Sequence, residues 1–235
     1  MREFMLDFLD TPLFGMVLTI AALLFFLRLF HGKKNPLLNP LIFSIAGVIL
    51  FLVVTGIPYE TYAKGGDYIS FFLGPVTVAL AVPLYKQFDK LKENAAPILI
   101  GITVGCIVAI VSTIGLGIMM DLNFDMLMSL APKATTSAIA MDLATNLGGD
   151  PALTVTFVII AGSTGYMFGE SIFKLMRIKH RTAKGIALGT ASHAFGTNRA
   201  LLMGEEEGAM SSLAIGVAGI ITTFLLPLVL GIFGF

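Results

Sequence analysis

The chain has 235 residues, of which 56% are hydrophobic and 13% are charged, and its formal net charge is zero. Soluble domains carry about 25% charged residues, so this composition excludes a soluble fold and indicates an integral membrane protein. The neutral charge balance gives no reason to expect nucleic acid as a partner. The apolar runs are far longer than the strands of about ten residues that form membrane barrels, and they therefore predict helices.

Five apolar runs are long enough to cross about 30 Å of hydrocarbon at about 1.5 Å per residue. These runs are 13–30, 39–57, 96–119, 152–173 and 209–233. Three further apolar segments are interrupted by Pro, Gly or polar residues, namely 69–86, 126–147 and 185–204. The sequence thus predicts an all-α polytopic membrane protein with about five to six full spans plus broken or re-entrant helices. The predicted helix breaks lie at Pro75, Pro132 and Gly196.

Basic residues set the expected orientation, because cytoplasmic loops are enriched in Lys and Arg. Most of the fifteen basic residues follow the run 13–30, the segment 69–86 or the run 152–173. The N-terminus is therefore expected outside. If 126–147 crossed the membrane fully, the cations after 152–173 would lie outside, against this rule. We therefore expect 126–147 to enter the membrane and return on the same side. By the same reasoning, 185–204 should enter and return from the cytoplasm. The basic residues concerned are Arg28, Lys33, Lys34, Lys86, Lys90, Lys92, Lys174, Arg177, Lys179, Arg181 and Lys184.

A faint internal repeat relates three of these segments. "LGPVTVALAVP" (73–83) resembles "LAPKATTSAIA" (130–140), and "LGTASHAFG" (188–196) is more weakly similar. A duplicated hairpin-plus-helix unit that enters from opposite faces would form an inverted repeat, as in many secondary transporters. The shared Ala, Thr and Gly composition of membrane helices explains the likeness equally well.

The first polar cluster is "APKATTSAIAMD", in 126–147. Pro132 suits the first turn of a new half-helix, whose unpaired amides attract anions, and Lys133, Thr135, Thr136 and Ser137 add a charge and hydroxyl groups. We therefore predict an anion site here. The alternative is that Lys133 extends to the membrane interface and that the hydroxyls bond to their own helix.

The second polar cluster is "SHAFGTNRA", which supplies Ser192, His193, Thr197, Asn198 and Arg199. The Arg199 guanidinium can hold a carboxylate with two parallel hydrogen bonds. His193 suits either proton uptake or a hydrogen bond between helices. The sequence predicts no metal site here, because no second His or Cys lies at ligand spacing, and it predicts no cofactor.

Four further features complete the predicted site. Asp142 and Glu170 are counter-ion or proton-carrier candidates, or else are exposed at the interface. Lys133 and Arg199 would repel each other near the midplane unless an anion lay between them. Glu205–Glu207 are read as a solvated first turn of the last helix. The sequence contains no nucleophile elbow, phosphate loop or HExxH motif, so we do not expect an enzyme.

The two clusters carry a resemblance to a known family. The blocks 132–162 and 189–228 resemble the signature regions of the LrgB/CidB family, although Asn198 stands where members commonly have Ala. The resemblance implies a single integral membrane domain over 1–235, with an N-terminal helix pair in 13–67 and a repeat-containing transport core in 69–235. It also implies a bacterial inner (cytoplasmic) membrane location and a smaller holin-like partner of the LrgA/CidA type, and it leaves homo-oligomer formation open.

The resemblance implies two alternative functions. Members are often described as antiholin-like proteins that modulate murein hydrolase export and autolysis. The plastidial glycolate/glycerate translocator contains a similar domain, and some bacterial pairs are linked to pyruvate uptake. Because a regulator that only assembles in the bilayer has no need for cations on broken helices, the polar clusters favour a secondary transporter of small monocarboxylates such as pyruvate, glycolate, glycerate or lactate. The antiholin-like regulator is the alternative.

Overall fold

A computed structural model of the chain describes residues 11–32, 38–72, 75, 78, 85, 88–93 and 95–235. Every regular element in these ranges is a helix. Four of the described helices are long and apolar enough to cross a membrane, and Pro40–Thr55 is a shorter apolar helix. The predicted all-α polytopic membrane fold is confirmed. The chain divides into two compact units, Met1–Ala79 and Leu80–Phe235.

The first unit contains α2 (Pro12–Leu29), α3 (Pro40–Thr55) and α4 (Tyr59–Ser70). Both α2 and α3 begin at a proline, whose fixed φ suits the first helical position. A methyl group at Gly65 in α4 would lie 2.6 Å from the Cα of Gly15 in α2, so two glycines allow these helices to touch backbone to backbone. The ring of Phe26 in α2 packs 5.9 Å from that of Phe43 in α3.

Two features of this unit differ from the expected pattern. The segment 58–68 lies between the predicted apolar run 39–57 and the interrupted segment 69–86, but most of it forms α4, whose Tyr62 hydroxyl lies 2.9 Å from that of Thr19 in α2. Helix α3 has 16 residues, fewer than the run 39–57 suggests. Most of 69–86 lies outside the described residues, so the break at Pro75 and the repeat segment 73–83 stay predictions.

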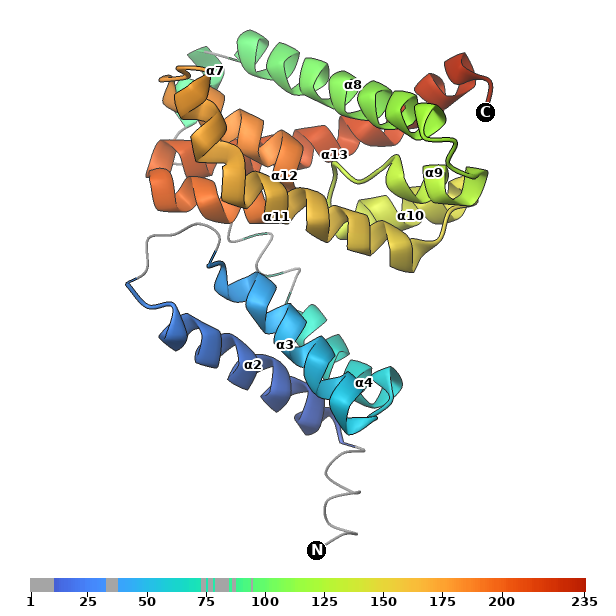
Figure 1. The fold of residues 1–235 in the computed structure, drawn as a ribbon. Helices are drawn as coiled ribbons and strands as arrows, with labels where there is room; N and C mark the ends of the chain where they lie inside the picture. Colours follow the sequence, from blue (N-terminus) through green and yellow to red (C-terminus); the bar gives the residue numbers. More distant parts are fainter. Residues whose placement is uncertain are drawn as a thin grey trace, which may run out of the picture. The chain divides into compact units, whose positions relative to one another are not determined.

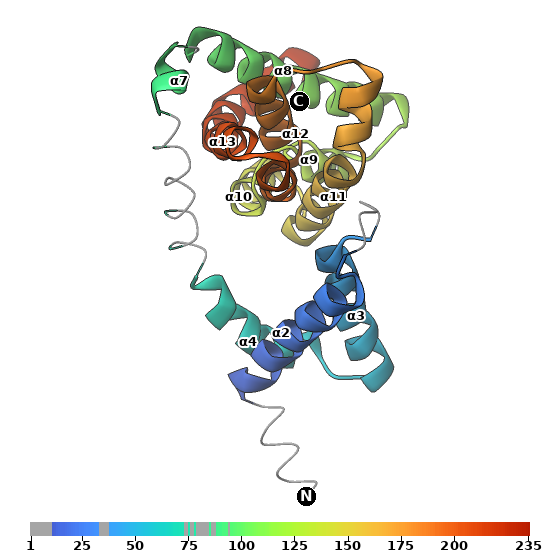
Figure 2. The same ribbon diagram turned by 90° about the vertical axis from the view of Figure 1, so that its left-hand side faces the viewer.

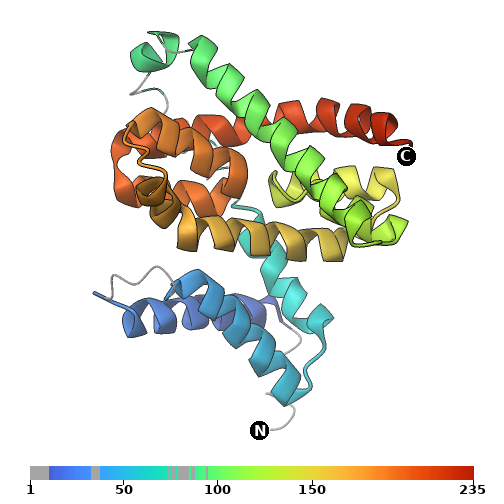
Figure 3. The same cartoon turned by 45° about the horizontal axis from the view of Figure 1, so that its top comes forward.

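Three long helices of the second unit match predicted runs: α8 (Ala95–Met119), α11 (Pro151–Leu175) and α13 (Glu205–Phe233). Figure 1 shows them with α12 (Arg181–Met203), which contacts all three. In Figure 2, α12 lies between α11 and α13. Figure 3 shows α8 crossing α13 obliquely. The short α7 (Phe88–Glu93) precedes α8.

The segment 126–147 is broken, as predicted. It forms α9 (Phe124–Leu130) and α10 (Ser137–Leu147), joined by a turn over 131–136, and we call this unit the first hairpin. The chain reverses within the turn, because a methyl group at Gly148, just after α10, would lie 3.2 Å from the Phe124 ring at the start of α9. The Asp150 amide also donates to Ser129 Oγ in α9 at 2.7 Å.

Helix α12 is a second hairpin that contains no proline. His193 has φ 36° and ψ −124°, which breaks the helix into the arms 181–192 and 194–203. Gly196 lies so close to Leu188 that a methyl group there would meet the Leu188 carbonyl, so the second arm folds back along the first. The predicted break at Gly196 is therefore wrong. The reversal lies at His193, and Gly196 instead lets the two arms approach closely.

The two hairpins have their bases at opposite ends of α11. The first hairpin ends just before Pro151 and the second begins just after Leu175. Helix α11 has 25 residues, which corresponds to a length of about 37 Å. Both hairpins also pack on α8 and α13 through buried apolar side chains. In the first hairpin, Leu127 and Met128 share a core with Ile110 and Leu226.

Candidate functional site

The tips of the two hairpins meet. His193 Nε2, at the tip of the second hairpin, lies 3.2 Å from the carbonyl oxygen of Lys133 in the turn of the first. A carbonyl only accepts, so this bond requires the proton on Nε2. The His193 side chain is buried. The contact joins two hairpins whose bases lie at opposite ends of α11, and it therefore places two interrupted helices against each other inside the unit.

The turn of the first hairpin follows from its sequence. Pro132 has no amide donor and is fully buried, and α9 ends two residues before it. Helix α10 begins later, at Ser137, where Thr136 Oγ1 accepts from the Ile139 amide at 3.5 Å. The expectation that Pro132 opens the second half-helix is thus wrong, because Pro132 lies in the turn and Thr136 supplies the N-cap.

Lys133 turns toward α8. Its Nζ donates to Thr113 Oγ1, a buried hydroxyl in the second half of that helix. Thr135, two residues further on, is also buried, and its Oγ1 has no hydrogen-bond partner. A buried hydroxyl without a partner is unusual and costs about 1–3 kcal/mol. The tip of the first hairpin therefore presents a cation and an unsatisfied hydroxyl within the fold.

The tip of the second hairpin packs on glycines of α11. A methyl group at Gly162 would lie 3.1 Å from His193 Cε1, and one at Gly165 would meet Ser192 Oγ. Two more buried hydroxyls lack a hydrogen-bond partner. Thr190 lies three residues before His193, and Ser163 follows Gly162 in α11. Small residues in α11 thus let a polar helix end approach closely, as in other membrane bundles.

Arg199 lies on the returning arm and has its own partners. Its Nη2 lies 2.7 Å from Glu170 Oε1 in α11, and its guanidinium lies over the Tyr166 ring at 5.5 Å. The Arg199 Nε is buried and has no hydrogen-bond partner. Because Glu170 already balances the charge of Arg199, the repulsion between Lys133 and Arg199 expected from the sequence requires no anion to relieve it.

The structure groups the predicted residues unevenly. Lys133, Thr135, Ser192 and His193 lie at or beside the two tips. Thr197 is buried and its Oγ1 lies 2.7 Å from Ser211 Oγ in α13. Asp142 and Asn198 are exposed. Among the described residues, no group of three or more His, Cys, Asp or Glu side chains could hold a metal.

The three consecutive acids Glu205–Glu207, at the start of α13, are the last predicted feature that the structure revises. Glu207 is buried, with Oε1 4.0 Å from Arg181 Nε, and Glu206 Oε1 accepts from Thr182 Oγ1 at 2.8 Å. Glu205 is exposed. The expected solvated turn is therefore only partly solvated, because the first turns of α12 and α13 lie side by side at the base of the second hairpin.

Sequence reasoning missed Thr113, Tyr166 and the buried hydroxyls of Ser163 and Thr190. Each is a polar side chain inside an apolar run, and that is the signal that could have identified them.

The fold and the site define a class: a polytopic helical membrane protein with two opposed broken-helix hairpins whose tips meet between long helices. The chain belongs to the LrgB-like family, whose model matches residues 19–232. It is 40% identical over 225 residues to the antiholin-like protein LrgB of Bacillus mycoides (strain KBAB4), a match that covers 95% of this chain and 98% of the relative. The antiholin-like proteins LrgB of Bacillus cereus (strain B4264) and Bacillus anthracis (strain CDC 684 / NRRL 3495) match with the same figures. No solved structure matches the chain.

Proposed function

We propose that this chain is an antiholin-like protein of the bacterial cytoplasmic membrane that modulates murein hydrolase export and autolysis with a smaller holin-like partner of the LrgA/CidA type. Support comes from its membership of the LrgB-like family and from the name that its relatives carry. In this proposal the N-terminus is outside, the cations after α11 are cytoplasmic, and the chain carries out no enzymatic step.

A groove on the second unit suits a partner helix. It has a volume of about 560 Å³ and runs between α8 and the first arm of α12. Small residues repeat every four positions on both sides, and such stripes let a membrane helix approach closely. The residues of the two stripes are Gly101, Gly105 and Ala109 in α8, and Ala183, Ala187 and Ala191 in α12.

The test is a leucine placed in the groove. A Cβ atom added at Gly101 meets no atom within 4 Å, so we expect Gly101→Leu to fold normally while it obstructs a docking helix. Gly115→Leu is the matched control, because Gly115 lies on the same helix, also in open space, and outside the groove. We expect Gly101→Leu alone to reduce co-purification with the holin-like partner and to alter the autolysis rate. Equal behaviour of the two variants would remove the groove from the proposal.

A second candidate function, transport of small monocarboxylates, is favoured by the meeting of the hairpin tips. Interrupted backbone at membrane depth is tolerated where it is buried in protein or lines a cavity, and secondary transporters bind substrate at such breaks. The buried Thr135 hydroxyl and the Arg199 Nε are donors without partners. In this proposal a substrate carboxylate takes one of these donors, and autolysis is modulated through organic-acid flux.

The substrate would compete with Glu170 for Arg199. A carboxylate that replaces Glu170 keeps the guanidinium paired, and the released Glu170 then suits the counter-ion or proton-carrier role. The proposed substrate-binding residues are Lys133, Thr135, Thr136, Ser192, His193, Thr197, Asn198 and Arg199, with Asp142, Glu170 and His193 as proton or counter-ion candidates.

Uptake of labelled pyruvate, glycolate, glycerate and lactate into proteoliposomes tests transport, with and without the holin-like partner. Lys133→Ala and Arg199→Ala should each lower uptake by at least about tenfold, a loss of about 1.4 kcal/mol of stabilisation. Arg199→Lys should recover only part of it, because the bidentate geometry is lost. Arg181→Gln, at an exposed cation, is the control. Normal uptake by both alanine variants would exclude this substrate site and leave the antiholin-like proposal standing.

A further inference from the structure

A basic cavity lies at the base of the second hairpin, away from the tips. It has a volume of about 540 Å³ and is lined from the end of α11, the linker that follows it, the first turns of α12 and α13, and the end of the returning arm. Four cations line it: Lys174, Arg177, Lys179 and Lys184.

The carboxylates of the cavity do not neutralise these cations. Two acids line it, Glu170 and Glu207. Glu170 is paired with Arg199 at 2.7 Å, and Glu207 faces Arg181, which lies outside the lining, at 4.0 Å. Among the described residues none of the four lining cations has an ion pair. The cavity therefore concentrates positive charge at one end of the bundle and attracts anions.

The positions of Lys174 and Lys184 at helix ends show where an anion would be most stabilising. Lys174 lies in the last turn of α11, where the helix dipole already stabilises a cation without a bound anion. Lys184 lies in the first turn of α12, the positive end of that helix, where a cation is disfavoured. The α12 N-cap residue, His180, makes no side-chain capping bond. An anion beside Lys184 would relieve both the charge and the helix end.

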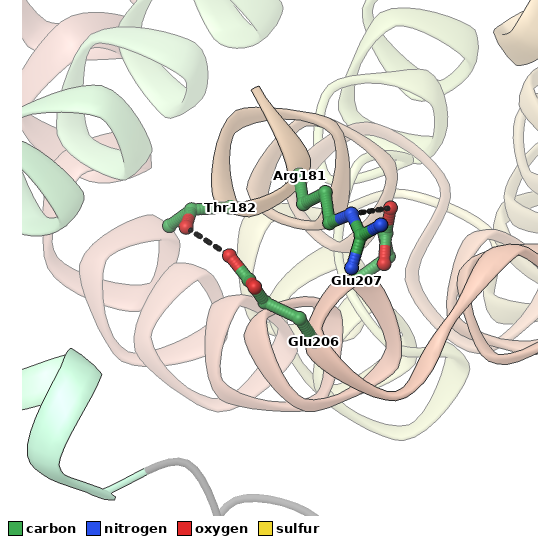
Figure 4. Close-up of polar contacts among 4 residues, drawn as sticks. All are labelled: Arg181, Thr182, Glu206 and Glu207. Carbon is green, nitrogen blue, oxygen red and sulfur yellow. Dashed lines mark hydrogen bonds and ion pairs between the residues drawn. The ribbon is translucent and has the colours of Figure 1, made fainter. Parts of the chain in front are cut away.

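The cavity wall is held in place by the contacts drawn in Figure 4. Thr182 Oγ1 donates to Glu206 Oε1 at 2.8 Å, and Arg181 faces Glu207, so the first turn of α12 is tied to the first turn of α13. These contacts fix the backbone that carries Lys184. The wall that carries Lys184 is therefore preformed, which lowers the ordering cost of binding there.

We propose that this cavity binds an oxyanion, a phosphate or carboxylate group held by Lys174, Arg177, Lys179 and Lys184. Two sources carry that chemistry: the headgroup of an anionic phospholipid and a soluble anion. Phe173, Ile178 and Met203 add an apolar part to the lining, against which the glycerol and upper acyl chain of a lipid would pack. Basic pockets at the ends of membrane helices bind anionic headgroups in this way.

The experiment measures thermal unfolding of the full-length chain in nanodiscs. One arm compares phosphatidylcholine discs with discs that contain increasing phosphatidylglycerol, and the other adds sodium phosphate or sodium pyruvate to phosphatidylcholine discs. We expect an anion-dependent rise in Tm. In Lys179→Gln/Lys184→Gln the same rise should need more anion, by about fivefold for each cation removed. Arg28→Gln/Lys92→Gln removes the same charge elsewhere and should behave as wild type.

The outcomes separate the sources and can overturn the site. A lysine-dependent response to phosphatidylglycerol alone assigns a lipid headgroup, and one to the dissolved salts assigns a soluble anion. No response in wild type, or equal loss in the control, overturns the proposal. If the double variant does not fold, Lys179→Gln alone replaces it. The anion-dependent rise in the Tm of the wild type should also decrease as potassium chloride is added, and its persistence would overturn the proposal. Transport plays no part in the readout, so this test is independent of the proposed function.

Discussion

The first hairpin reverses the chain over residues 131–136, whereas the second reverses it at the single residue His193. In the first, a proline ends one helix and a threonine cap starts the next. In the second, a histidine occupies a backbone conformation that L-residues rarely adopt. A helix break that a proline and an N-cap residue cause locally needs little stabilisation from neighbouring helices. A break in a strained backbone conformation persists only where the surrounding structure imposes it.

The surroundings of the second hairpin provide that constraint through glycines. Gly185, Gly189 and Gly196 each lie against backbone, in α13 for the first two and in the other arm for the third. In the first hairpin the comparable backbone contact is at the base, where a methyl group at Gly149 would lie 2.7 Å from the Ser129 amide nitrogen. The second hairpin should therefore be the more sensitive of the two to added volume along its arms.

The largest expected effect is that of a methyl group in the second hairpin. In Gly189→Ala the new methyl group would meet the Ser211 carbonyl and lie 2.8 Å from Ala214 Cβ. We expect a loss of about 1–3 kcal/mol in the free energy of unfolding. Gly216→Ala in α13, where nothing lies within 4 Å, is the control and should be neutral or stabilising. Equal Tm values for the two variants would contradict the tight packing.

A smaller loss is expected from the base of the first hairpin. Ser129 is fully buried, and its Oγ accepts from the Asp150 amide and donates to the Asp125 carbonyl. Ser129→Ala leaves that amide unpaired and should cost about 1–2 kcal/mol. Ser112→Ala, which removes an exposed hydroxyl from α8, should leave Tm nearly unchanged. A similarly small change for Ser129→Ala would show that the base of the first hairpin is open to water.

The contrast between the breaks predicts opposite preferences for glycine. Both His193→Ala and His193→Gly lose the bond to Lys133, but only glycine accepts the positive φ, so the glycine variant should be more stable by about 1 kcal/mol. At Ala134, in the turn of the first hairpin, φ is not positive, so Ala134→Gly should destabilise by about 0.4–1 kcal/mol through the greater entropy of the unfolded chain. Thermal unfolding in detergent, without added denaturant, measures the stability changes at both positions. A less stable glycine at 193 would contradict the strained break.

The smallest effect is expected at the base of the second hairpin. Arg181 Nε lies 4.0 Å from Glu207 Oε1, and the Arg181 side chain is 71% exposed. Exposed ion pairs contribute about 0–1 kcal/mol, so Arg181→Gln should change Tm little. Thr182→Val, which removes the bond to Glu206, should cost more. The reverse order in thermal unfolding would mean that the ion pair holds this base.

The same contrast explains what the sequence could predict. The long helices follow from apolar length, and the break in 126–147 follows from Pro132 and the distribution of basic residues. The position of the break in α12 did not follow, because nothing in His193 favours φ 36°, and the glycines at which this hairpin packs on α11 and α13 meet it only in the folded chain. The Arg199–Glu170 pair was likewise out of reach, since both residues were candidates but only the fold brings α11 beside the returning arm.

The opposed arrangement of the two hairpins is tested most directly by thiol labelling in a Cys106→Ala background. Asp125→Cys and Asn146→Cys report the two ends of the first hairpin, and Lys179→Cys and Glu205→Cys report those of the second; all four positions are exposed. An impermeant reagent should label the first pair together in intact cells and the second pair together only in inside-out vesicles. Labelling of Asp125→Cys and Asn146→Cys from opposite sides would contradict the account, because 124–147 would then cross the membrane.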